Sequence, residues 1–231
     1  NIVHLAAISF VAHGNTAEIY QVNQLGTINL LDAIRKNAPE IKKVLIASSA
    51  NIYGNTTALP ITESVPPAPV NHYGMPKVAM ELATRLYADL PIVLSRPFNY
   101  TCCGQSPNFL IPKIVNAFKD SKRAIELGNL DVSRDFSDVR DVVAAYLRLL
   151  ETHIAAPAYN VCSGIATSLL SVIEALNELA GYDIQVSINP DFIRRDEIKT
   201  LYGSPALLEA AIGSYRQYAL TDTLAWMLAG K

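Results

Sequence analysis

The chain has 231 residues, half of them hydrophobic and 17% charged, which allows one or two domains with a real core and excludes a disordered segment. Three cysteines exclude a disulfide scaffold and favour free thiols in the cytoplasm, and the net charge of −2 gives no basic surface for nucleic acid. No apolar run reaches the ~18 residues that a membrane span needs, and the first residues do not look like a signal peptide.

Short apolar segments alternate with longer segments of helical periodicity. The expected strands are 2–8, 43–47, 92–95, 124–127 and 159–161. The expected helices are 15–37, 73–88, 110–118, 139–150, 169–179 and 220–228. This alternation predicts βαβ units and a mostly parallel sheet, and therefore an α/β fold, because nearly unbroken apolar strands need cover on both faces. After Arg96 the pattern loosens, which predicts a smaller mixed region that contributes a substrate cleft.

The strongest chemical signal is the segment Tyr73-Gly74-Met75-Pro76-Lys77. A tyrosine and a lysine four residues apart share one face of a helix. An ammonium group beside a phenol lowers the pKa of the phenol from ~10, so that Tyr73 exchanges a proton near neutral pH. Taken alone, this spacing is more often a surface pair that has arisen by chance.

A second signal precedes it in the chain. The expected strand 43–47 is followed directly by Ser48 and Ser49. Hydroxyl groups at the carboxyl end of a parallel strand lie where open α/β sheets bind ligands, although serines also cap helices and turns there. The strand, the hydroxyl groups, the loop and the Tyr/Lys helix together form a much more specific pattern than either part alone.

With these residues the sequence resembles the extended short-chain dehydrogenase/reductase family of nucleotide-sugar-modifying enzymes, over essentially the whole chain. The resemblance is carried further by HLAA at 4–7, NQLGTINLL at 23–31, RPFN at 96–99, LGNLDVSRDF at 127–136 and YNV at 159–161. It implies a Rossmann-like doubly wound parallel sheet. Residues 1–98 and 139–161 would form the dinucleotide-binding domain, and 99–138 and 162–231 the nucleotide-sugar-binding region. It also implies NAD or NADP as cofactor, and a homodimer through helices that start near Thr16 and Tyr73.

The resemblance assigns roles to individual residues. The implied catalytic residues are Ser49, Tyr73 and Lys77. The implied cofactor contacts are Leu5, Ala6, Ala7, Val22, Ser48, Tyr73, Lys77 and Phe98. The implied substrate contacts are Ser49, Asn99, Lys113, Arg134, Arg194 and Glu197. Planar guanidinium groups suit bidentate contacts with a diphosphate. The four histidines are scattered, so we expect no metal site.

The activity can be narrowed within the family. Segments 132–136, 160–164, 194–197 and 203–204 are most similar to reductases of GDP-4-keto-6-deoxy-hexoses, which implies NAD(P)H-dependent reduction of a C4 keto group. A GDP-mannose 4,6-dehydratase needs a further carboxylate after the catalytic hydroxyl, and Ala50 and Asn51 provide none. A nucleotide-sugar 4-epimerase uses the same three residues. A non-catalytic sensor or assembly protein on this fold is the alternative of another class.

Two departures from the family pattern stand out. The chain contains no G-x-x-G-x-x-G motif and starts at what looks like the fourth strand of the fold. We therefore expect an N-terminally incomplete sheet, a bare strand edge at 2–8 and weakened dinucleotide binding. The second departure is Thr101-Cys102-Cys103-Gly104, where relatives usually carry Thr-Gly-x-Gly. A cysteine tolerates glycine's backbone angles poorly, which predicts a loop that is different or strained, with two free thiols.

Overall fold

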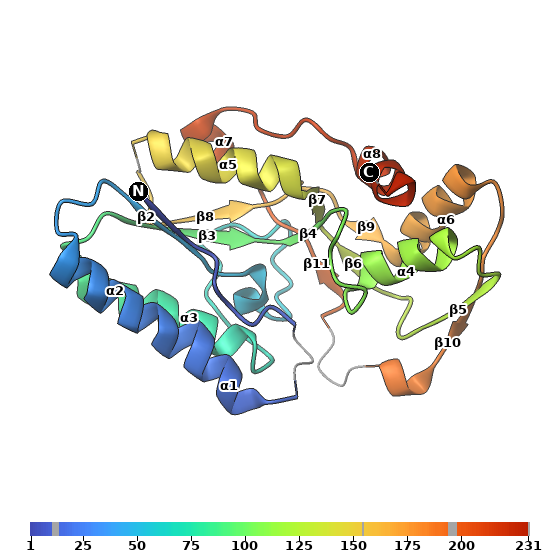
Figure 1. Ribbon diagram of the computed structural model, residues 1–231, viewed down its shortest axis with the longest axis horizontal. Coiled ribbons are helices and arrows are strands. Elements are labelled where there is room, and N and C mark those ends of the chain that lie inside the picture. Colours follow the sequence, from blue (N-terminus) through green and yellow to red (C-terminus); the bar gives the residue numbers. More distant parts are fainter. Residues whose placement is uncertain (11–13, 154, 194–197, 231) are drawn as a thin grey trace.

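The computed structural model describes residues 1–10, 14–153, 155–193 and 198–230 (Figure 1). The elements up to the third strand are β1 (Ile2–His4), α1 (Thr16–Tyr20), the π-helical segment η1 (Gln21–Leu25), α2 (Gly26–Asn37), β2 (Val44–Ala47), the 3₁₀ turn η2 (Ala50–Tyr53), α3 (Gly74–Thr84), η3 (Arg85–Tyr87) and β3 (Ile92–Pro97). The remaining elements are β4 (Asn99–Thr101), α4 (Leu110–Lys119), β5 (Ala124–Leu127), β6 (Ser133–Arg134), β7 (Phe136–Asp138), α5 (Val139–Glu151), β8 (Ala158–Val161), β9 (Thr167–Ser168), α6 (Leu169–Ala180), β10 (Gln185–Ile188), η4 (Pro190–Phe192), β11 (Thr200–Leu201), α7 (Ala206–Ile212) and α8 (Leu220–Ala229).

A four-stranded parallel sheet in the order β1-β2-β3-β8 forms the centre of the larger part. Helices α1, α2 and α3 cover one face of this sheet, and α5 and α7 cover the other (Figure 1). Along β2 the side chains alternate between the two faces, so that Val44 and Ile46 join the core under α2 and α3 while Leu45 joins the core under α5. The predicted α/β class and parallel sheet are therefore confirmed.

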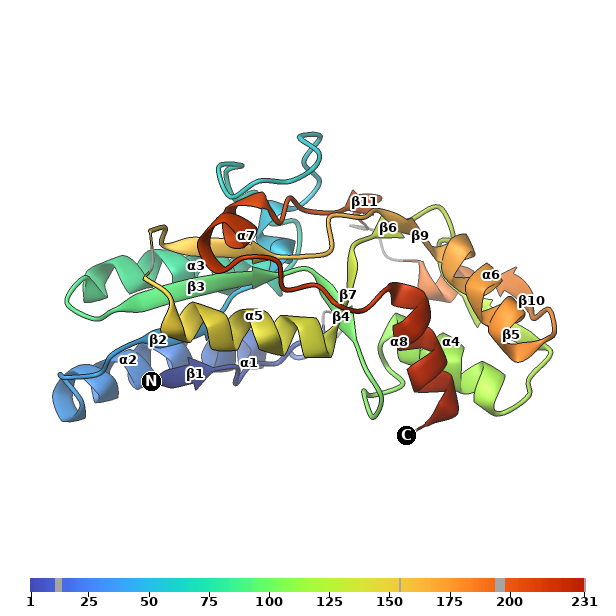
Figure 2. The same cartoon turned by 90° about the horizontal axis from the view of Figure 1, so that it is seen from above.

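The smaller part has a core of its own. Helices α4, α6 and α8 pack together beside the two-stranded parallel sheet of β5 and β10, as Figure 2 shows from above. Helix α7 lies in the range 162–231 that we expected to form the nucleotide-sugar-binding region. Its Leu208 nevertheless packs with Leu45 and Val142 in the core of the four-stranded sheet. The C-terminal part of the chain thus returns to the larger part before it reaches α8.

The first strand and the first helix differ from expectation. Strand β1 ends at His4 instead of extending to Ile8, because the backbone of Ile8 bonds to a side chain and not to a neighbouring strand. The amide of Asn23 accepts from the Ile8 N–H at 2.7 Å and donates to its carbonyl at 2.9 Å. Asn23 lies in η1, so the expected helix 15–37 contains a π-helical turn, a feature that recurs at functional sites. Among the described residues β1 pairs with β2 alone.

Some elements carried no usable sequence signal. Helix α7 has only seven residues, and strands β9 and β11 have two each. Such short elements do not complete enough periods to be recognised. In the part of the chain that the structure covers, no helix is long and apolar enough to cross a membrane, and no group of side chains could hold a metal ion.

A buried polar network joins four elements below the carboxyl ends of the strands. The guanidinium of Arg96 donates to both carboxylate oxygens of Glu81, at 3.1 and 2.7 Å, and to the hydroxyl of Tyr53 at 2.9 Å. Tyr53 in turn donates to the side chain of Asn160 at 2.8 Å. The network therefore connects β3, α3, η2 and β8, and it fixes α3 relative to the sheet.

We predict that Glu81→Gln lowers the free energy of unfolding by about 3–5 kcal/mol, because it leaves the buried Arg96 charge without its carboxylate. Urea denaturation followed by circular dichroism measures the change. The matched control is Asp89→Asn, which breaks the exposed ion pair with Arg35 and should leave the midpoint nearly unchanged. Equal midpoints for the two variants would contradict a structural role for the buried pair.

Candidate active site

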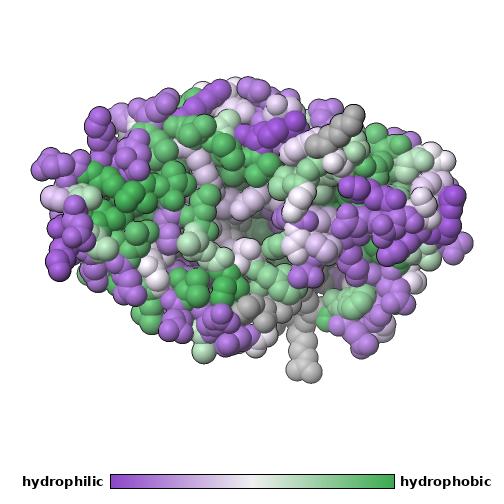
Figure 3. All heavy atoms as spheres, viewed as in Figure 1, coloured by the Kyte–Doolittle hydropathy of each residue, from purple (hydrophilic) through white to green (hydrophobic). Residues whose placement is uncertain are grey.

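The predicted catalytic residues lie where two local structures meet. Strand β2 ends at Ala47 and leads through Ser48 and Ser49 into η2, while Tyr73 directly precedes the first turn of α3. In the view of Figure 1, the surface in Figure 3 has a hollow near its middle. The hollow lies between the part with the four-stranded sheet and the part with α4 and α6. The structure thus brings the serines, Tyr73 and Lys77 to the carboxyl end of the sheet, as the sequence predicted.

Tyr73 is held in place by its neighbours in the chain and by a close approach of two backbones. The side chain of Asn71 accepts from the N–H groups of Tyr73, at 3.1 Å, and of Gly74, at 2.8 Å. A Cβ atom on Gly74 would lie 2.8 Å from the carbonyl oxygen of Asn51, which is closer than real side chains come. Only glycine therefore lets the start of α3 lie against η2, and this places Tyr73 beside Ser49.

The electrostatics of Tyr73 differ from the prediction. Burial raises the pKa of its phenol to about 12, and hydrogen bonding with Ser49 only partly opposes this shift. The expectation that Lys77 would lower the pKa of Tyr73 is wrong for this structure, because desolvation of the phenolate is the dominant effect. Tyr73 therefore keeps its proton at neutral pH.

Lys77 is buried in the first turn of α3, four positions after Tyr73. Its ammonium donates to the carbonyl oxygen of Ala47 at 2.7 Å, and only 4% of the residue is exposed. Burial lowers the pKa of Lys77 to about 8, although the charge of Glu81 opposes the shift. The pKa of His4 is lowered too, first by burial and then by the charge of Lys77. His4 bonds to the hydroxyl of Thr27 at 2.9 Å, so the ammonium lies near the end of β1.

The two serines have different surroundings. The hydroxyl of Ser49 accepts from the N–H of Asn51 at 3.2 Å and so caps η2. The hydroxyl of Ser48 is buried and has no hydrogen-bond partner among the described residues. A buried hydroxyl without a partner at the carboxyl end of a parallel strand fits a site that binds a polar ligand. This observation agrees with the predicted cofactor contact at Ser48.

The other expected cofactor residues are spread over the same edge of the sheet. Leu5 and Ala6 are exposed just beyond β1, Ala7 is half-buried, and Val22 lies in η1 next to the Asn23 side chain that holds Ile8. Phe98 is only 4% exposed and belongs to a core cluster with Tyr53 and Cys162. A contact between Phe98 and the cofactor therefore stays a prediction, as do the contacts of the residues after β1.

The expected substrate residues lie beyond β3. Asn99 is exposed in β4, next to Tyr100. Lys113 donates to the carbonyl oxygen of Glu126 at 2.9 Å and lies 4.1 Å from the ring of Phe192. Arg134 donates to the carbonyl oxygens of Ser133 and Lys199, at 2.9 and 3.0 Å. Arg194 and Glu197 lie outside the described residues.

Sequence reasoning assigned no role to three residues near the site. They are Asn23, Asn51 and Asn71, whose amides fix the end of β1, the Ser49 hydroxyl and the start of α3. The only available signal was their position inside or beside the recognised motifs. Asparagine is common in turns for many reasons, so that position did not predict which partner each amide binds.

The cysteine pair is resolved without backbone strain. Cys102 and Cys103 are free thiols, as predicted. Neither has a positive φ; the left-handed conformation falls on Gly104, with φ +78°. The backbone at Cys102 and Cys103 therefore does not need glycine, and the predicted strain at the cysteines is absent.

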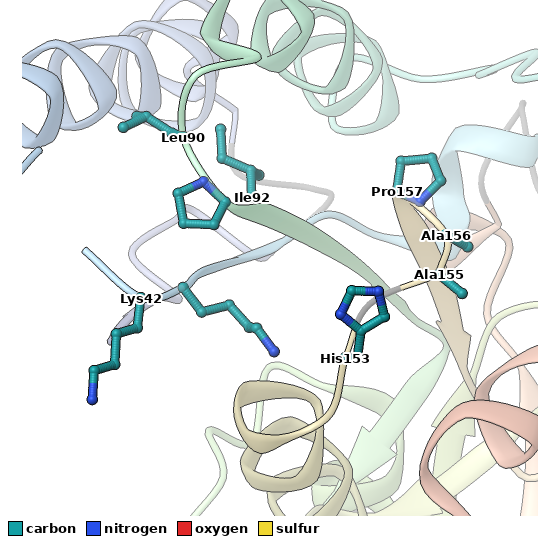
Figure 4. Close-up of a pocket in the computed structure, with 9 residues that line it drawn as sticks. Lys42, Leu90, Ile92, His153, Ala155, Ala156 and Pro157 are labelled. Atoms are coloured by element: carbon teal, nitrogen blue, oxygen red, sulfur yellow. The ribbon is translucent and has the colours of Figure 1, made fainter. Parts of the chain in front are cut away.

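A separate cavity of about 470 Å³ lies at the amino ends of β2, β3 and β8 (Figure 4). Lys42, Ile92, His153 and Pro157 are among the residues that line it. This cavity lies at the amino ends of the strands, whereas Ser49 and Tyr73 lie at their carboxyl ends. It is therefore not part of the candidate active site.

The buried ammonium of Lys77 predicts a pH-dependent stability. Between pH 8 and 10 the unfolded chain keeps the proton on this lysine while the folded protein has released it, so stability rises with pH. Relative to Lys77→Met, the parent protein should gain about 2–3 kcal/mol over this range. Urea denaturation at a series of pH values measures the difference. Lys36→Met, which changes an exposed lysine of α2, is the control; a parent protein that changes no more than Lys77→Met would contradict the burial of a charged group.

The comparisons with known proteins agree with this geometry. A model of the family described as GDP-mannose 4,6 dehydratase matches residues 1–227. GDP-6-deoxy-D-talose 4-dehydrogenase of Aggregatibacter actinomycetemcomitans is 39% identical, over 92% of this chain and 73% of that protein. GDP-6-deoxy-D-mannose reductase of Pseudomonas aeruginosa is 34% identical, over 99% of this chain and 79% of that protein.

Solved structures share the fold over nearly the whole chain. A Burkholderia cenocepacia protein, described provisionally as an epimerase, is 50% identical with a TM-score of 0.91, over 98% of this chain and 74% of that one. The structure of RMD from Pseudomonas aeruginosa in complex with NADPH is 34% identical with a TM-score of 0.90, over 99% of this chain and 80% of that one. The chain therefore belongs to the GDP-mannose 4,6-dehydratase family, within the extended short-chain dehydrogenases/reductases.

Proposed function

We propose that this protein is an NAD(P)H-dependent oxidoreductase that reduces the C4 keto group of a GDP-4-keto-6-deoxy-hexose. The observation that carries the proposal is a protonated Tyr73 beside Ser49, with Lys77 buried behind them and no carboxylate at the two positions after Ser49. The names of the two relatives support this reading, because both act on GDP-linked 6-deoxy sugars and neither is named a dehydratase.

The residues of the site supply the proton chemistry. Tyr73, with a pKa of about 12, donates its proton to the alkoxide that develops at C4 of the sugar, and Ser49 donates a hydrogen bond to the same oxygen. Lys77 would bind the ribose of a nicotinamide dinucleotide, and the unpaired Ser48 hydroxyl would contact the same cofactor. When bound, the reduced nicotinamide supplies the hydride. Asn99, Arg134, Arg194 and Glu197 are the proposed contacts of the nucleotide sugar, together with Lys113.

The alternatives make different demands on the site. A 4-epimerase uses the same three residues, and the description of the Burkholderia protein favours it. A dehydratase needs an acid/base carboxylate where this chain has Ala50 and Asn51. A non-catalytic protein would have no need of a buried serine, tyrosine and lysine at one sheet edge. We therefore rank the reductase first and the epimerase second.

We also propose a homodimer. Met75, Leu82 and Leu86 recur along one face of α3 and η3, and each is at least 48% exposed. Leu25 of η1 is 52% exposed, and η1 and α2 run beside α3 in both ribbon views (Figures 1 and 2). Two copies of this face would form a four-helix bundle that covers these side chains. A cytoplasmic location stays a prediction, which rests on the free cysteines.

We predict that Tyr73→Phe lowers kcat by a factor of about 10²–10⁴, because it removes the proton donor while it keeps the shape of the side chain. Binding of NADPH and of the nucleotide sugar should change less than threefold in calorimetric titrations. Tyr87→Phe, which removes the hydroxyl that bonds to Asp32 at the far end of α3, is the matched control. A Tyr73→Phe protein with kcat within threefold of the parent would contradict the assignment of Tyr73 as the proton donor.

The balance of cofactor separates the three enzyme classes. A reductase should oxidise one NAD(P)H for each GDP-4-keto-6-deoxy-hexose, which is followed as loss of nicotinamide absorbance with the product identified by mass. An epimerase returns the hydride to its substrate and shows no net oxidation. Conversion of GDP-mannose to the 4-keto-6-deoxy sugar without added reductant would show a dehydratase and would contradict our reading of Ala50 and Asn51.

A further inference from the structure

The side chain of Asn51 bonds to the hydroxyl of Ser49. Its amide nitrogen Nδ2 donates to Ser49 Oγ at 3.3 Å, and its backbone N–H donates to the same oxygen at 3.2 Å. One residue therefore makes two contacts with one hydroxyl oxygen. Asn51 lies two positions after Ser49 in η2, and nothing in the chemistry described so far uses its side chain.

These two contacts fix the direction of the serine hydrogen bond. A hydroxyl group has two acceptor lone pairs and one proton. When Asn51 fills both acceptor positions, the remaining hydrogen of Ser49 points away from Asn51. The phenol of Tyr73 is close to this hydroxyl group, because hydrogen bonding with Ser49 lowers its pKa against the effect of burial. The proton of Ser49 is therefore left for a partner other than Asn51.

We propose that Asn51 is a positioning residue that holds the Ser49 hydroxyl as a hydrogen-bond donor to the carbonyl oxygen of the substrate. The proposal deepens the proposed function and rests on it for the identity of the reacting oxygen. An amide is suited to this task because Nδ2 can only donate. A carboxylate at the same position would accept the serine proton and withdraw it from the substrate.

The surroundings of Asn51 make the arrangement rigid. Its neighbours Ala50 and Ile52 are 1% and 0% exposed. Its carbonyl oxygen faces Gly74 at the start of α3, where a Cβ atom would come within 2.8 Å. The backbone of Asn51 is thus fixed on both sides, and a change of its side chain acts on the Ser49 hydroxyl without displacing η2.

The kinetic test compares Asn51→Ala and Asn51→Asp with the parent in the keto-reduction assay. We expect Asn51→Ala to lower kcat about tenfold and to change KM less than twofold, since orientation matters most when charge develops on the oxygen. Near neutral pH the kcat of Asn51→Asp should be lower than that of Asn51→Ala. It should rise as the pH is lowered, because the new carboxyl group is then protonated and becomes a donor. Tyr73 and Lys77, the titrating groups at this site, are present in every variant, so the acid recovery should be specific to Asn51→Asp. Asn55→Ala, at an exposed position beyond η2, is the matched control.

A double-mutant cycle shows whether Asn51 acts through Ser49. In a Ser49→Ala background, the further change Asn51→Ala should alter kcat less than twofold. Additive losses in the cycle would overturn the proposal, because they would show an action independent of the hydroxyl. Full activity of Asn51→Asp at all pH values would overturn it too, because the side chain would then be an acceptor.

A readout without turnover separates this proposal from the proposed function. In nuclear magnetic resonance spectra, Ser49→Ala should shift the side-chain amide signals of Asn51, identified by their loss in Asn51→Asp, and leave those of Asn55 unchanged. Amide signals of Asn51 that do not move would overturn the proposal. A parent protein without reductase activity, but with the shifted Asn51 signals, would contradict the proposed function while supporting the orientation of Ser49 by Asn51.

Discussion

The close approach of Gly74 to the backbone of Asn51 is the contact on which the site depends. It joins the turn after β2 to the first turn of α3, two segments that are more than twenty residues apart in the chain. Any side chain at position 74 would collide with a carbonyl group, which cannot swing away as a flexible side chain would. Tyr73 and Ser49 are neighbours because this approach is possible.

Burial then gives the two titrating residues opposite properties. Desolvation disfavours charge, so it raises the pKa of the Tyr73 phenol and lowers that of the Lys77 ammonium. At neutral pH the tyrosine is therefore a proton donor, which is the role that reduction of a carbonyl requires. The buried pair of Arg96 and Glu81 is compatible with this low-dielectric setting, because each charge has its partner within hydrogen-bond distance.

Asparagine side chains orient the hydrogen bonds around this centre. Asn71 accepts from the start of α3, Asn23 both donates to and accepts from the turn after β1, and Asn51 donates to Ser49. An amide carries a donor and an acceptor but no charge, so it can set a direction without changing the local charge. This distinguishes the site from one that needs a third titrating group, such as the carboxylate of a dehydratase.

The sequence alone determined the α/β class and nearly all the longer helices, and it predicted the trio Ser49, Tyr73 and Lys77 as the catalytic residues. These features depend on short spacings: apolar periodicity within an element, and a tyrosine and a lysine four positions apart at the start of one helix. Tertiary structure decided what depends on burial and on distant contacts. It raised the pKa of Tyr73 where the Tyr-Lys spacing predicted a decrease, ended β1 at His4 because Asn23 captures Ile8, returned α7 to the core of the sheet, and gave the Asn51 amide its partner. Desolvation and hydrogen-bond direction depend on which groups the fold encloses together, and no local pattern of residues records that.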